Sequence, residues 1–529
     1  MIHHFLEKSA RQFPDKTAVI TDTERATYKQ INSRANQLAR LLIHHNVQSQ
    51  DIVVLMMDNC VEYIIAYYAS LKTGAVVVPF SNDLKPESIN HLLQELEPKI
   101  LISSKKFERK LKACDLRSSS LLAMIIHDIK QDWQHLDFPV IPLSELEIRP
   151  ELEIGSKLEN LSNTTDMDAT IEKNIDKDID NNQLASIIYT SGSSGTPKGV
   201  MLSHANITAN TNSICEYLNL TSSDIQMVVL PFFYVMGKSL LNTLFAVGGT
   251  IVINNKFAFP ASVINQMVQE KVTLFSGVPS TYAFLLNRSP LESFKDKLIH
   301  LRCCTQAGGH MASSIKKKLV KVLPVHTQIC IMYGATEASA RLTWLEPALL
   351  EKKIDSIGKP IPGVNINILD KNNYKVPKGE TGELVASGKN IMSGYWKDPE
   401  TTADVLDKNG YHTGDQGYKD EDGFYFIKGR KDSLLKVGGH RINPQEIEDA
   451  LMETDLVVES AVIGIKDDLL GNKLIAFASV KDKQSTPNII LAKCSQLLPK
   501  YKMPAQIHIV KNLPKNANGK INKAALYTI

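Results

Sequence analysis

The sequence lacks the features that mark several classes of protein. Its 60 basic and 57 acidic residues leave a net charge of +3 over 529 residues, so the charge gives no reason to expect a nucleic acid or an anionic membrane surface as a partner. No uncharged apolar run reaches the roughly 18 residues that a membrane-spanning helix needs. The opening residues, MIHHFLEKSARQFPDK, carry charges where a signal peptide has an apolar core.

The number and spacing of the cysteines also exclude some classes of site. The seven cysteines are scattered, and none has the CxxC or Cys/His spacing of a metal site. An odd number of cysteines in a large chain is typical of reduced thiols, so we expect a cytoplasmic protein. With 43% hydrophobic and 22% charged residues, the composition is that of a globular protein, and the length allows more than one domain.

Strand-like and helix-like segments alternate near the start of the chain. Strands are expected at Thr17–Asp22, Asp51–Met57 and Ala75–Phe80, and helices at Tyr28–Leu42 and Cys60–Lys72. This alternation predicts an α/β protein with a mainly parallel sheet that is covered by helices.

A polar stretch interrupts the pattern at residues 156–183. It is rich in Asp and Asn and has few large apolar residues. We expect a mobile insertion here. A solvated loop without a function of its own is favoured over a regulatory segment.

The most informative stretch is Leu184–Ser203, LASIIYTSGSSGTPKGVMLS. An apolar strand, Leu184–Tyr189, leads into a loop of glycines and hydroxyls that ends with a lysine. Such a loop turns backbone N–H groups toward a ligand and adds a positive charge, which suits a polyphosphate. Ser203 is expected to cap a helix that begins near His204. The predicted phosphate-binding residues are Thr190, Ser191, Gly192, Ser193, Ser194, Gly195, Thr196 and Lys198.

Two other interpretations of this loop are disfavoured. A flexible Ser/Gly linker would not be expected between a buried strand and a second apolar segment. A Walker A loop requires GxxxxGK[ST], and that spacing is absent here. The triplet Gly237-Lys238-Ser239 fails as well, because Phe232 stands where the first glycine should be.

The loop TSGSSGTPKG resembles the phosphate loop of the adenylate-forming superfamily, which comprises acyl-CoA synthetases, aryl-CoA ligases, adenylation domains of peptide synthetases and luciferases. The segments TYKQINSRANQLARLL and ASLKTGAVVVPF also resemble the opening of that family. The resemblance implies an α/β fold with a large N-terminal domain of helix-covered mixed sheets, a β-rich subdomain and a small α+β C-terminal domain. Residues 1–431 would form the first domain and 432–529 the second, with the hinge at Asp432.

Further motifs carry the resemblance into the nucleotide site. The segment Tyr333–Glu337 resembles YGxTE, in which the aromatic ring flanks adenine, the threonine meets phosphate and the glutamate holds Mg²⁺. The family also implies that Gly308 and Gly309 lie against the base. Asp415 and Arg430 would reach the ribose, because a carboxylate suits a cis-diol. The predicted nucleotide and metal residues are Tyr333, Gly334, Thr336, Glu337, Gly308, Gly309, Asp415 and Arg430.

The acyl pocket is assigned by the same resemblance. A strand that ends at Pro231 is followed by the predicted pocket residues Tyr234, Val235, Met236 and Gly237, and Ser276 and Gly277 belong to the next wall. No acidic residue occurs between Ile225 and Gln269. A buried substrate ammonium would therefore be unpaired, which argues against an α-amino acid. Lys238 has no role in this picture and is expected either to face solvent or to contact a polar or acidic acyl group.

The resemblance extends to the end of the chain. The segment Gly379–Leu384 opens a β-rich stretch that includes Gly394–Trp396. After the hinge, Lys436, Gly438 and Gly439 would line a thiol channel, and Pro444 fits the start of a helix. The terminal PKNANGKI resembles the family's PKxxxGKI motif, whose lysine, here Lys520, joins the substrate carboxylate and the α-phosphate.

The implied reaction has two halves, with catalytic roles for Lys520, Glu337, Thr336 and Lys198. A carboxylate attacks ATP·Mg²⁺ to give acyl-AMP and pyrophosphate, and a thiol then displaces AMP. The thiol belongs to coenzyme A or to the phosphopantetheine of a separate carrier protein, with coenzyme A favoured. A non-catalytic relative that only binds nucleotide or acyl ligands is the alternative from another class. The sequence does not indicate the oligomeric state.

Overall fold

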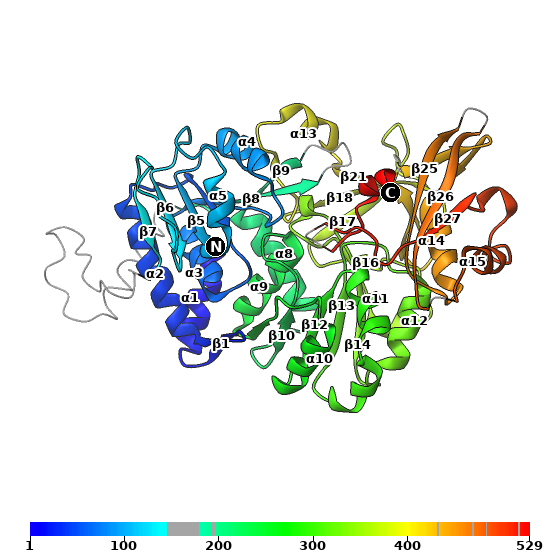
Figure 1. Cartoon of the computed structure of the whole chain (residues 1–529), viewed down its shortest axis with the longest axis horizontal. Coiled ribbons are helices and arrows are strands. Elements are labelled where there is room, and N and C mark those ends of the chain that lie inside the picture. Colours follow the sequence, from blue (N-terminus) through cyan, green and yellow to red (C-terminus); the bar gives the residue numbers. More distant parts are fainter. Residues whose placement is uncertain (145–178, 192–196, 431–432, 468–469, 483, 517–518) are drawn as a thin grey trace, which may run out of the picture. The chain divides into compact units, whose positions relative to one another are not determined.

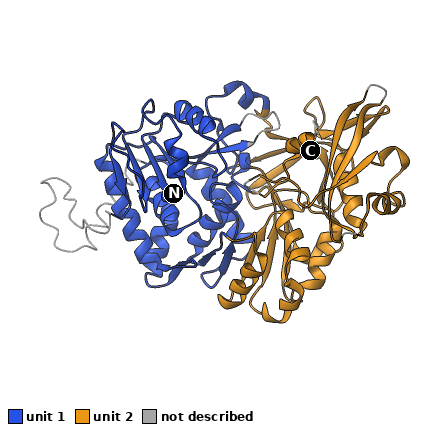
Figure 2. Ribbon diagram, in the orientation of Figure 1, with its two compact units in different colours: residues 1–255, 336–340, 389–404 blue, residues 256–335, 341–388, 405–529 orange. Residues whose placement is uncertain are grey.

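The computed structural model in Figure 1 describes residues 1–144, 179–191, 197–430, 433–467, 470–482, 484–516 and 519–529. Most of the predicted insertion, the loop residues 192–196 and the predicted hinge residue Asp432 lie outside the described residues. The chain forms two compact units, coloured in Figure 2. Unit 1 consists of Met1–Asn255, Thr336–Ala340 and Lys389–Asp404, and unit 2 of Lys256–Ala335, Arg341–Gly388 and Val405–Ile529.

Unit 1 contains a mixed sheet with the strand order β19-β9-β8-β4-β3-β5-β6-β7. The strands from β8 to β7 run parallel, whereas β9 is antiparallel to both β8 and β19. Side chains of α4 pack on the β3 and β4 side chains of one face. The elements are β3 (Ile52–Met56), β4 (Val76–Pro79), β5 (Ile100–Ser104), α5 (Glu108–Lys112), β6 (Ala123–His127), β7 (Val140–Pro142), β8 (Leu184–Ser191), β9 (Pro197–Ser203), β19 (Gly394–Tyr395) and α4 (Pro86–Leu96).

A second group of strands in unit 1 has the order β10-β11-β1-β2. All twelve residues of α3 are buried, as are the first eleven of α9. A helix that is buried all round lies inside a layered domain rather than on its surface. The elements are β10 (Ile225–Val228), β11 (Thr250–Ile253), β1 (Thr17–Ile20), β2 (Arg25–Thr27), α1 (His3–Gln12), α2 (Tyr28–His44), α3 (Val61–Lys72), α8 (His204–Tyr217) and α9 (Val235–Val247).

Unit 2 begins with three parallel strands, β12, β13 and β14, extended by antiparallel β15 and β16. Helix α10 precedes β12, α11 lies between β12 and β13, and α12 lies between β13 and β14 in the chain; Figure 1 labels all three helices. The elements are α10 (Pro260–Gln269), β12 (Leu274–Gly277), α11 (Pro279–Arg288), β13 (Cys303–Gln306), α12 (Ser313–Val322), β14 (Gln328–Tyr333), β15 (Thr343–Leu345) and β16 (Lys359–Pro360).

The rest of unit 2 is a β-rich part and the C-terminal residues. The β-rich part is antiparallel, in the order β17-β18-β21-β20 with β22 paired to β21, and comprises β17 (Val364–Leu369), β18 (Gly382–Gly388), β20 (Leu406–Asp407), β21 (Gly410–Lys419) and β22 (Tyr425–Arg430). After residue 432 come a hairpin, a three-stranded sheet and two helices, namely β23 (Leu435–Val437), β24 (His440–Ile442), α14 (Pro444–Glu453), β25 (Val457–Asp467), β26 (Gly471–Val480), α15 (Pro487–Cys494) and β27 (Gln506–Ile509).

The predicted fold class is confirmed, and so are most of the predicted local elements. The strands and helices expected up to residue 80 all form, and each end lies within two residues of its predicted position. Ser203 caps α8 by accepting from the Asn206 N–H, and Asn206 returns the bond in a capping box. In the part of the chain that the structure describes, no helix is long and apolar enough to cross a membrane.

Gly394–Tyr395, expected in a β-rich stretch, do form a strand, but it does not join the sheet of β17, β18, β20, β21 and β22. These residues form β19, which pairs with Val200 and Met201 of β9 in the unit 1 sheet. The pairing partners are almost 200 residues apart in the sequence, so no local pattern indicates the pairing. The division at residue 431 does not coincide with the two compact units, and it stays a prediction.

Gly358 and Gly363 provide a test of packing in unit 2, because both have positive φ angles but different surroundings. A Cβ on Gly358 would lie 1.9 Å from the Trp344 carbonyl oxygen, whereas a Cβ on Gly363 would meet nothing within 4 Å. We expect Gly363→Ala to lower the free energy of unfolding by about 1 kcal/mol, from backbone strain alone, and Gly358→Ala by about 3 kcal/mol or more. Urea denaturation checks this, and equal losses would contradict it.

Candidate active site

In unit 1, the predicted phosphate loop connects the two strands of a hairpin. Thr190 of β8 pairs with Lys198 of β9, and Ser191 pairs with Pro197. The loop residues Gly192, Ser193, Ser194, Gly195 and Thr196 lie outside the described residues. The Lys198 Nζ lies 5.3 Å from the centre of the Tyr395 ring on β19. Lys198 therefore lies near the start of β9, at the loop end of the hairpin, with an aromatic face beside its charge.

Glu337, the predicted metal ligand, also contacts Tyr395. It lies in a short 3₁₀ turn, Thr336–Ala338, and is half-buried. The Tyr395 hydroxyl donates to Glu337 Oε1 at 2.9 Å, and the Met392 N–H donates to the Glu337 carbonyl oxygen at 2.8 Å. Tyr395 thus links the two predicted charged groups of unit 1. A held carboxylate of this kind has the oxygen ligands that Mg²⁺ prefers.

In unit 2, Tyr333, Asp415 and Arg430 form one hydrogen-bonded group. The Tyr333 hydroxyl donates to Asp415 Oδ2 at 2.5 Å, and Arg430 Nε donates to Asp415 Oδ1 at 3.1 Å. Arg430 Nη2 also donates to the Thr413 carbonyl oxygen at 3.1 Å. Burial, and then the neighbouring Asp415 carboxylate, raises the pKa of Tyr333 well above its usual value. Tyr333 therefore remains a donor at neutral pH.

Three neighbouring parallel strands bring further predicted residues to one edge. Gly277 ends β12 and pairs with Gln306, which ends β13 and pairs with Ile331 of β14. Gly308 and Gly309 follow β13, and Gly334 follows Tyr333 at the end of β14. Ligands of open α/β sheets bind at this carboxyl-terminal edge. Ser276 is almost fully buried and shares a hydrogen bond of 2.7 Å with Thr305, so its hydroxyl is engaged within the sheet.

Lys520 lies on a loop that reaches the same edge. The Ser280 hydroxyl, at the start of α11, donates to the Gly519 carbonyl oxygen at 2.6 Å. The Lys520 side chain is exposed, and its backbone N–H donates to Asn516 Oδ1 at 3.0 Å. Ser280 is three positions after Gly277 in the sequence. The contact therefore holds the terminal motif close to the predicted pocket wall.

The residues predicted for the thiol channel contact other groups. Gly438 and Gly439 form the turn of the β23–β24 hairpin. The Gly438 N–H donates to the Leu470 carbonyl oxygen at 2.9 Å, and Asn472 donates to the Lys436 carbonyl oxygen at 2.9 Å. The loop that carries Lys520 thus reaches the strand edge. The Lys436–Gly439 hairpin instead contacts Leu470 and Asn472, which also lie after residue 432.

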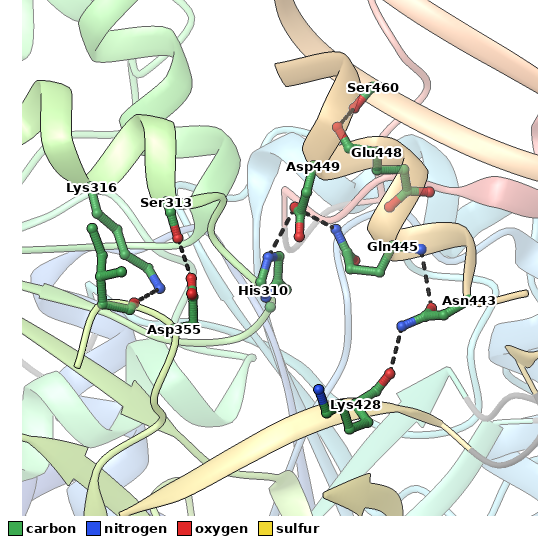
Figure 3. Close-up of polar contacts among 12 residues, drawn as sticks. His310, Ser313, Lys316, Asp355, Lys428, Asn443, Gln445, Glu448, Asp449 and Ser460 are labelled. Carbon is green, nitrogen blue, oxygen red and sulfur yellow. Dashed lines mark hydrogen bonds and ion pairs between the residues drawn. The ribbon is translucent and has the colours of Figure 1, made fainter. Parts of the chain in front are cut away.

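Several polar contacts join the residues after 432 to α11, α12 and the loop after β13. His310, next to the Gly308–Gly309 pair, lies 3.0 Å from Asp449 of α14, as Figure 3 shows. Arg288 donates to the Asn512 side chain at 2.7 Å, to the Lys511 carbonyl oxygen at 3.0 Å and to the Ser479 hydroxyl at 3.2 Å. These contacts fix one arrangement of the C-terminal residues within unit 2.

The predicted pocket residues of unit 1 lie at the start of α9. Tyr234 is half-buried, and Val235, Met236 and Gly237 are buried. A Cβ on Gly237 would lie 2.1 Å from the Pro231 carbonyl oxygen, so α9 packs closely on the preceding turn. Lys238 is only 3% exposed, and the expectation that it faces solvent is wrong.

Sequence reasoning missed several residues that hold the predicted ones. Tyr395, Thr413, Ser280 and Arg288 make the contacts described above, but none of them received a role. Tyr395 belongs to the segment Gly394–Trp396, and its aromatic side chain is the one local feature that could have indicated a role. Ser280 and Arg288 act across more than 190 residues of chain, and no local pattern reveals such contacts.

Two other features of the described residues, a His/Glu cluster and a polar cavity, lie apart from the predicted site residues. His3, His4 and Glu7 in unit 1 have ligand atoms within 4.8 Å of one another. However, Glu7 forms a buried ion pair with Lys72, and an ammonium there disfavours a metal ion. A cavity of about 670 Å³ in the β-rich part is lined mainly by polar residues, among them Lys359, Lys375 and Lys419, and contains none of the predicted site residues.

Comparison with known proteins identifies the family. Residues 6–396 match the model of AMP-binding enzymes, and residues 446–520 match that of the AMP-binding enzyme C-terminal domain. The long-chain-fatty-acid–CoA ligase of Bacillus subtilis (strain 168) is 30% identical over 99% of this chain and 94% of its own length. The 2-succinylbenzoate–CoA ligase of Bacillus pumilus (strain SAFR-032) is 30% identical over 97% and 95%.

A solved structure has the same fold. The crystal structure of the anthranilate CoA ligase AuaEII, in complex with anthranoyl-AMP, superimposes with a TM-score of 0.86 at 24% identity. The match covers 100% of this chain and 96% of that chain. At this level of identity, the match establishes the architecture.

The Arg288 contacts give a prediction for the C-terminal residues. Arg288→Ala removes all three hydrogen bonds to Asn512, Ser479 and the Lys511 carbonyl, so we expect faster amide hydrogen exchange in β27, by about tenfold. Exchange mass spectrometry measures this. Lys317→Ala, on the exposed face of α12, is the matched control and should leave β27 unchanged. Equal exchange in wild type and Arg288→Ala would contradict the contact.

Proposed function

The chain belongs to the AMP-binding, adenylate-forming enzymes and is an acid–thiol ligase of the acyl-CoA synthetase type, and from this premise we propose which residues perform its two reactions. A carboxylate oxygen attacks the α-phosphorus of ATP, pyrophosphate leaves, and acyl-AMP forms. The sulfur of coenzyme A then attacks the acyl carbon, AMP leaves, and the thiol proton passes to solvent. ATP, Mg²⁺ and coenzyme A are the cofactors of this type of enzyme.

For the first reaction, the polyphosphate is assigned to the unit 1 residues. Lys198 and the hydroxyls of the loop that begins at Thr190 would neutralise and orient the β- and γ-phosphates, and Thr336 would donate to phosphate. The contact that best supports this is Tyr395, which donates to Glu337 and lies beneath Lys198. One tyrosine thus orders an ammonium and a carboxylate, the two charges that a magnesium polyphosphate requires.

Glu337 is the proposed ligand of Mg²⁺. The Tyr395 hydrogen bond restrains its carboxylate, and the side chain is half-buried, so the residues present fit a hard cation with oxygen ligands. When bound, Mg²⁺ offsets negative charge on the phosphates. The carboxylate of Glu337 has only to stay ionised and oriented for this purpose.

The nucleoside is assigned to the unit 2 residues. Asp415 would accept the two ribose hydroxyls, Arg430 would reinforce this contact, and the Tyr333 ring and Gly308–Gly309 would flank the adenine. Tyr333 and Glu337 belong to the same predicted motif and are four positions apart in the chain.

Lys520 is the proposed catalytic lysine. Its ammonium would stabilise the charge that develops between the acid carboxylate and the α-phosphate. The Ser280–Gly519 contact supports this role, because it holds the terminal loop near Gly277. For the second reaction, we propose rotation of residues 432–529 about Asp432, which withdraws Lys520 and brings Lys436, Gly438 and Gly439 to the thiol.

The acid is proposed to lack an α-amino group. Among residues 225–269, which include the first pocket wall and all of α9, no carboxylate is available to pair with a substrate ammonium. The two relatives named above act on a long-chain fatty acid and on 2-succinylbenzoate, so both aliphatic and aryl acids are candidates. The pocket walls Tyr234–Gly237 and Ser276–Gly277 would choose between them.

We also propose the cytoplasm as the compartment. All seven cysteines lie in the described part of the chain, and none forms a disulfide, which fits a reducing environment. Coenzyme A is the proposed acceptor there, and the phosphopantetheine of a separate carrier protein is the alternative.

Pyrophosphate and AMP release across a panel of acids tests the proposed function. The panel spans short to long fatty acids, aryl acids and amino acids, each with and without coenzyme A. We expect one class of non-amino acid to give AMP release that rises at least about tenfold with coenzyme A. Acyl-AMP formation that coenzyme A does not accelerate would favour the carrier protein. Nucleotide binding without turnover of any acid would refute the ligase.

A lysine substitution tests the two-reaction scheme. We expect Lys520→Ala to slow acyl-AMP formation by about 10²-fold or more, because the charge at the reacting oxygens loses its partner. Thioester formation from supplied acyl-AMP should change less than about threefold, since Lys520 is withdrawn in that reaction. Lys473→Ala, exposed on β26, is the control and should affect neither. Equal losses in both reactions would contradict separate arrangements.

A further inference from the structure

Lys238 is a buried lysine on the first turn of α9. It is 3% exposed, and its Nζ donates to the Tyr63 hydroxyl on α3 at 2.6 Å. The same nitrogen lies 4.4 Å and 3.8 Å from the ring centres of Tyr63 and Tyr67. Among the described residues, no carboxylate lies within ion-pair distance of Lys238. Lys72, on the same helix as these tyrosines, is equally buried but pairs with Glu7.

This environment is costly for a lysine. Moving an ammonium out of water without a carboxylate partner opposes folding, and two aromatic faces with one hydroxyl compensate for it only in part. Burial accordingly lowers the pKa of Lys238 well below its usual value. An apolar side chain of the same length would fill this space at a lower cost. Lys238 therefore does not serve to stabilise the fold.

The partners of Lys238 lead to the predicted pocket wall. Tyr63 Oη lies 3.2 Å from the Phe232 carbonyl oxygen, to which it donates. Asn59 holds the same turn, accepting from the Phe232 N–H at 2.7 Å and donating to the Leu230 carbonyl oxygen at 2.8 Å. The turn at residues 230–234 continues directly into Tyr234, Val235, Met236 and Gly237.

The order of donors gives Lys238 a specific effect. The Tyr63 hydroxyl has one proton, and when Lys238 donates to its oxygen, that proton is directed to the Phe232 carbonyl. Hydrogen bonds in such a chain polarise one another, so the Lys238 donor also strengthens the bond from Tyr63 to Phe232. Without Lys238, the Tyr63 hydroxyl loses this constraint, and its hydrogen bond no longer reinforces the Asn59 contacts with the turn at 230–234.

We propose that Lys238 is a positioning residue for acid selection, which acts through Tyr63 to fix the turn at residues 230–234 and thereby the pocket wall Tyr234–Gly237. This inference rests on the proposed function, which assigns that wall to the acid. Lys238 does not touch the acid. Its burial lowers the stability of the fold, but its contacts keep the pocket wall rigid. A shift of such a wall by a fraction of an ångström alters substrate binding.

Lys238→Met is the test, because methionine has a similar length and no charge. Steady-state kinetics with the best acid of the wild type give KM and kcat, and thermal denaturation gives the melting temperature. We expect the KM for the acid to rise by about tenfold or more, whereas kcat and the KM for ATP change less than about threefold. The melting temperature should stay the same or rise, since a lysine without a carboxylate partner no longer has to be buried.

Tyr63→Phe provides a second variant on the same chain of contacts. It should raise the KM for the acid to a similar extent but lower the melting temperature, because Lys238 stays buried without its hydrogen-bond acceptor. The double variant Lys238→Met/Tyr63→Phe should raise KM no further than either single change, since both break one chain. This comparison holds even where one single variant folds poorly.

Lys72 supplies the matched control, being a lysine of equal burial on α3. Lys72→Met should lower the melting temperature, because Glu7 is left as an unpaired buried charge, and it should not change the KM for the acid. Where Lys72→Met does not fold, the double variant Glu7→Gln/Lys72→Met removes both charges and serves instead. Opposite effects of the two lysines on stability and on KM support the proposal.

Three outcomes overturn the proposal. An unchanged KM for the acid in Lys238→Met would show that the lysine does not position the wall. A rise confined to acids with a second anionic group would show direct contact between Lys238 and the acid. A fall in kcat with KM unchanged would place its effect on the chemical step. A wild type that turns over no acid would instead refute the proposed function, and this inference with it.

Discussion

The common carboxyl-terminal edge of β12, β13 and β14 is the constraint on which the candidate site depends. Parallel strands in register must end together, so Gly277, the Gly308–Gly309 pair and Tyr333 arrive at one edge although about 55 residues separate the first from the last. Asp415 is held at this edge by Tyr333, and Gly519 by Ser280. The position of Lys520 therefore follows from the register of three strands whose residues are mostly apolar.

The predictability of each part depends on how far apart the interacting residues lie. Ser203 and Asn206 form a capping box within four residues, and the sequence was sufficient to place the start of α8. The buried strand β8 likewise showed a local apolar run. The residues of the candidate site were found because whole motifs resemble a family. Tyr395, whose hydroxyl meets Glu337 from 58 positions away, has no local pattern that indicates its contact, and neither does the pairing of β19 with β9.

Three lysines of unit 1, Lys72, Lys198 and Lys238, show how the surroundings of a lysine determine its role. Lys72 is paired with Glu7, so its charge is compensated and it belongs to the scaffold. Lys198 is half-buried and shares Tyr395 with Glu337, so its charge is available to a ligand. Lys238 is surrounded by tyrosines and meets no carboxylate among the described residues. All three residues are lysines, so the sequence alone does not distinguish them. Only their tertiary contacts show that Lys72 is compensated by an ion pair, that Lys198 is available to a ligand and that Lys238 positions other groups.

The pairing of β19 with β9 also has a consequence for how the protein is made. Lys198 emerges from the ribosome almost 200 residues before Tyr395. At about 10 residues per second, that interval lasts roughly 20 s. During this time the edge of β9 that will receive β19 has no partner, and exposed strand edges invite pairing with other chains. Tyr395, which contacts both the Lys198 ammonium and the Glu337 carboxylate, is synthesised only after about three quarters of the chain. A shorter nascent chain therefore cannot form this group of contacts.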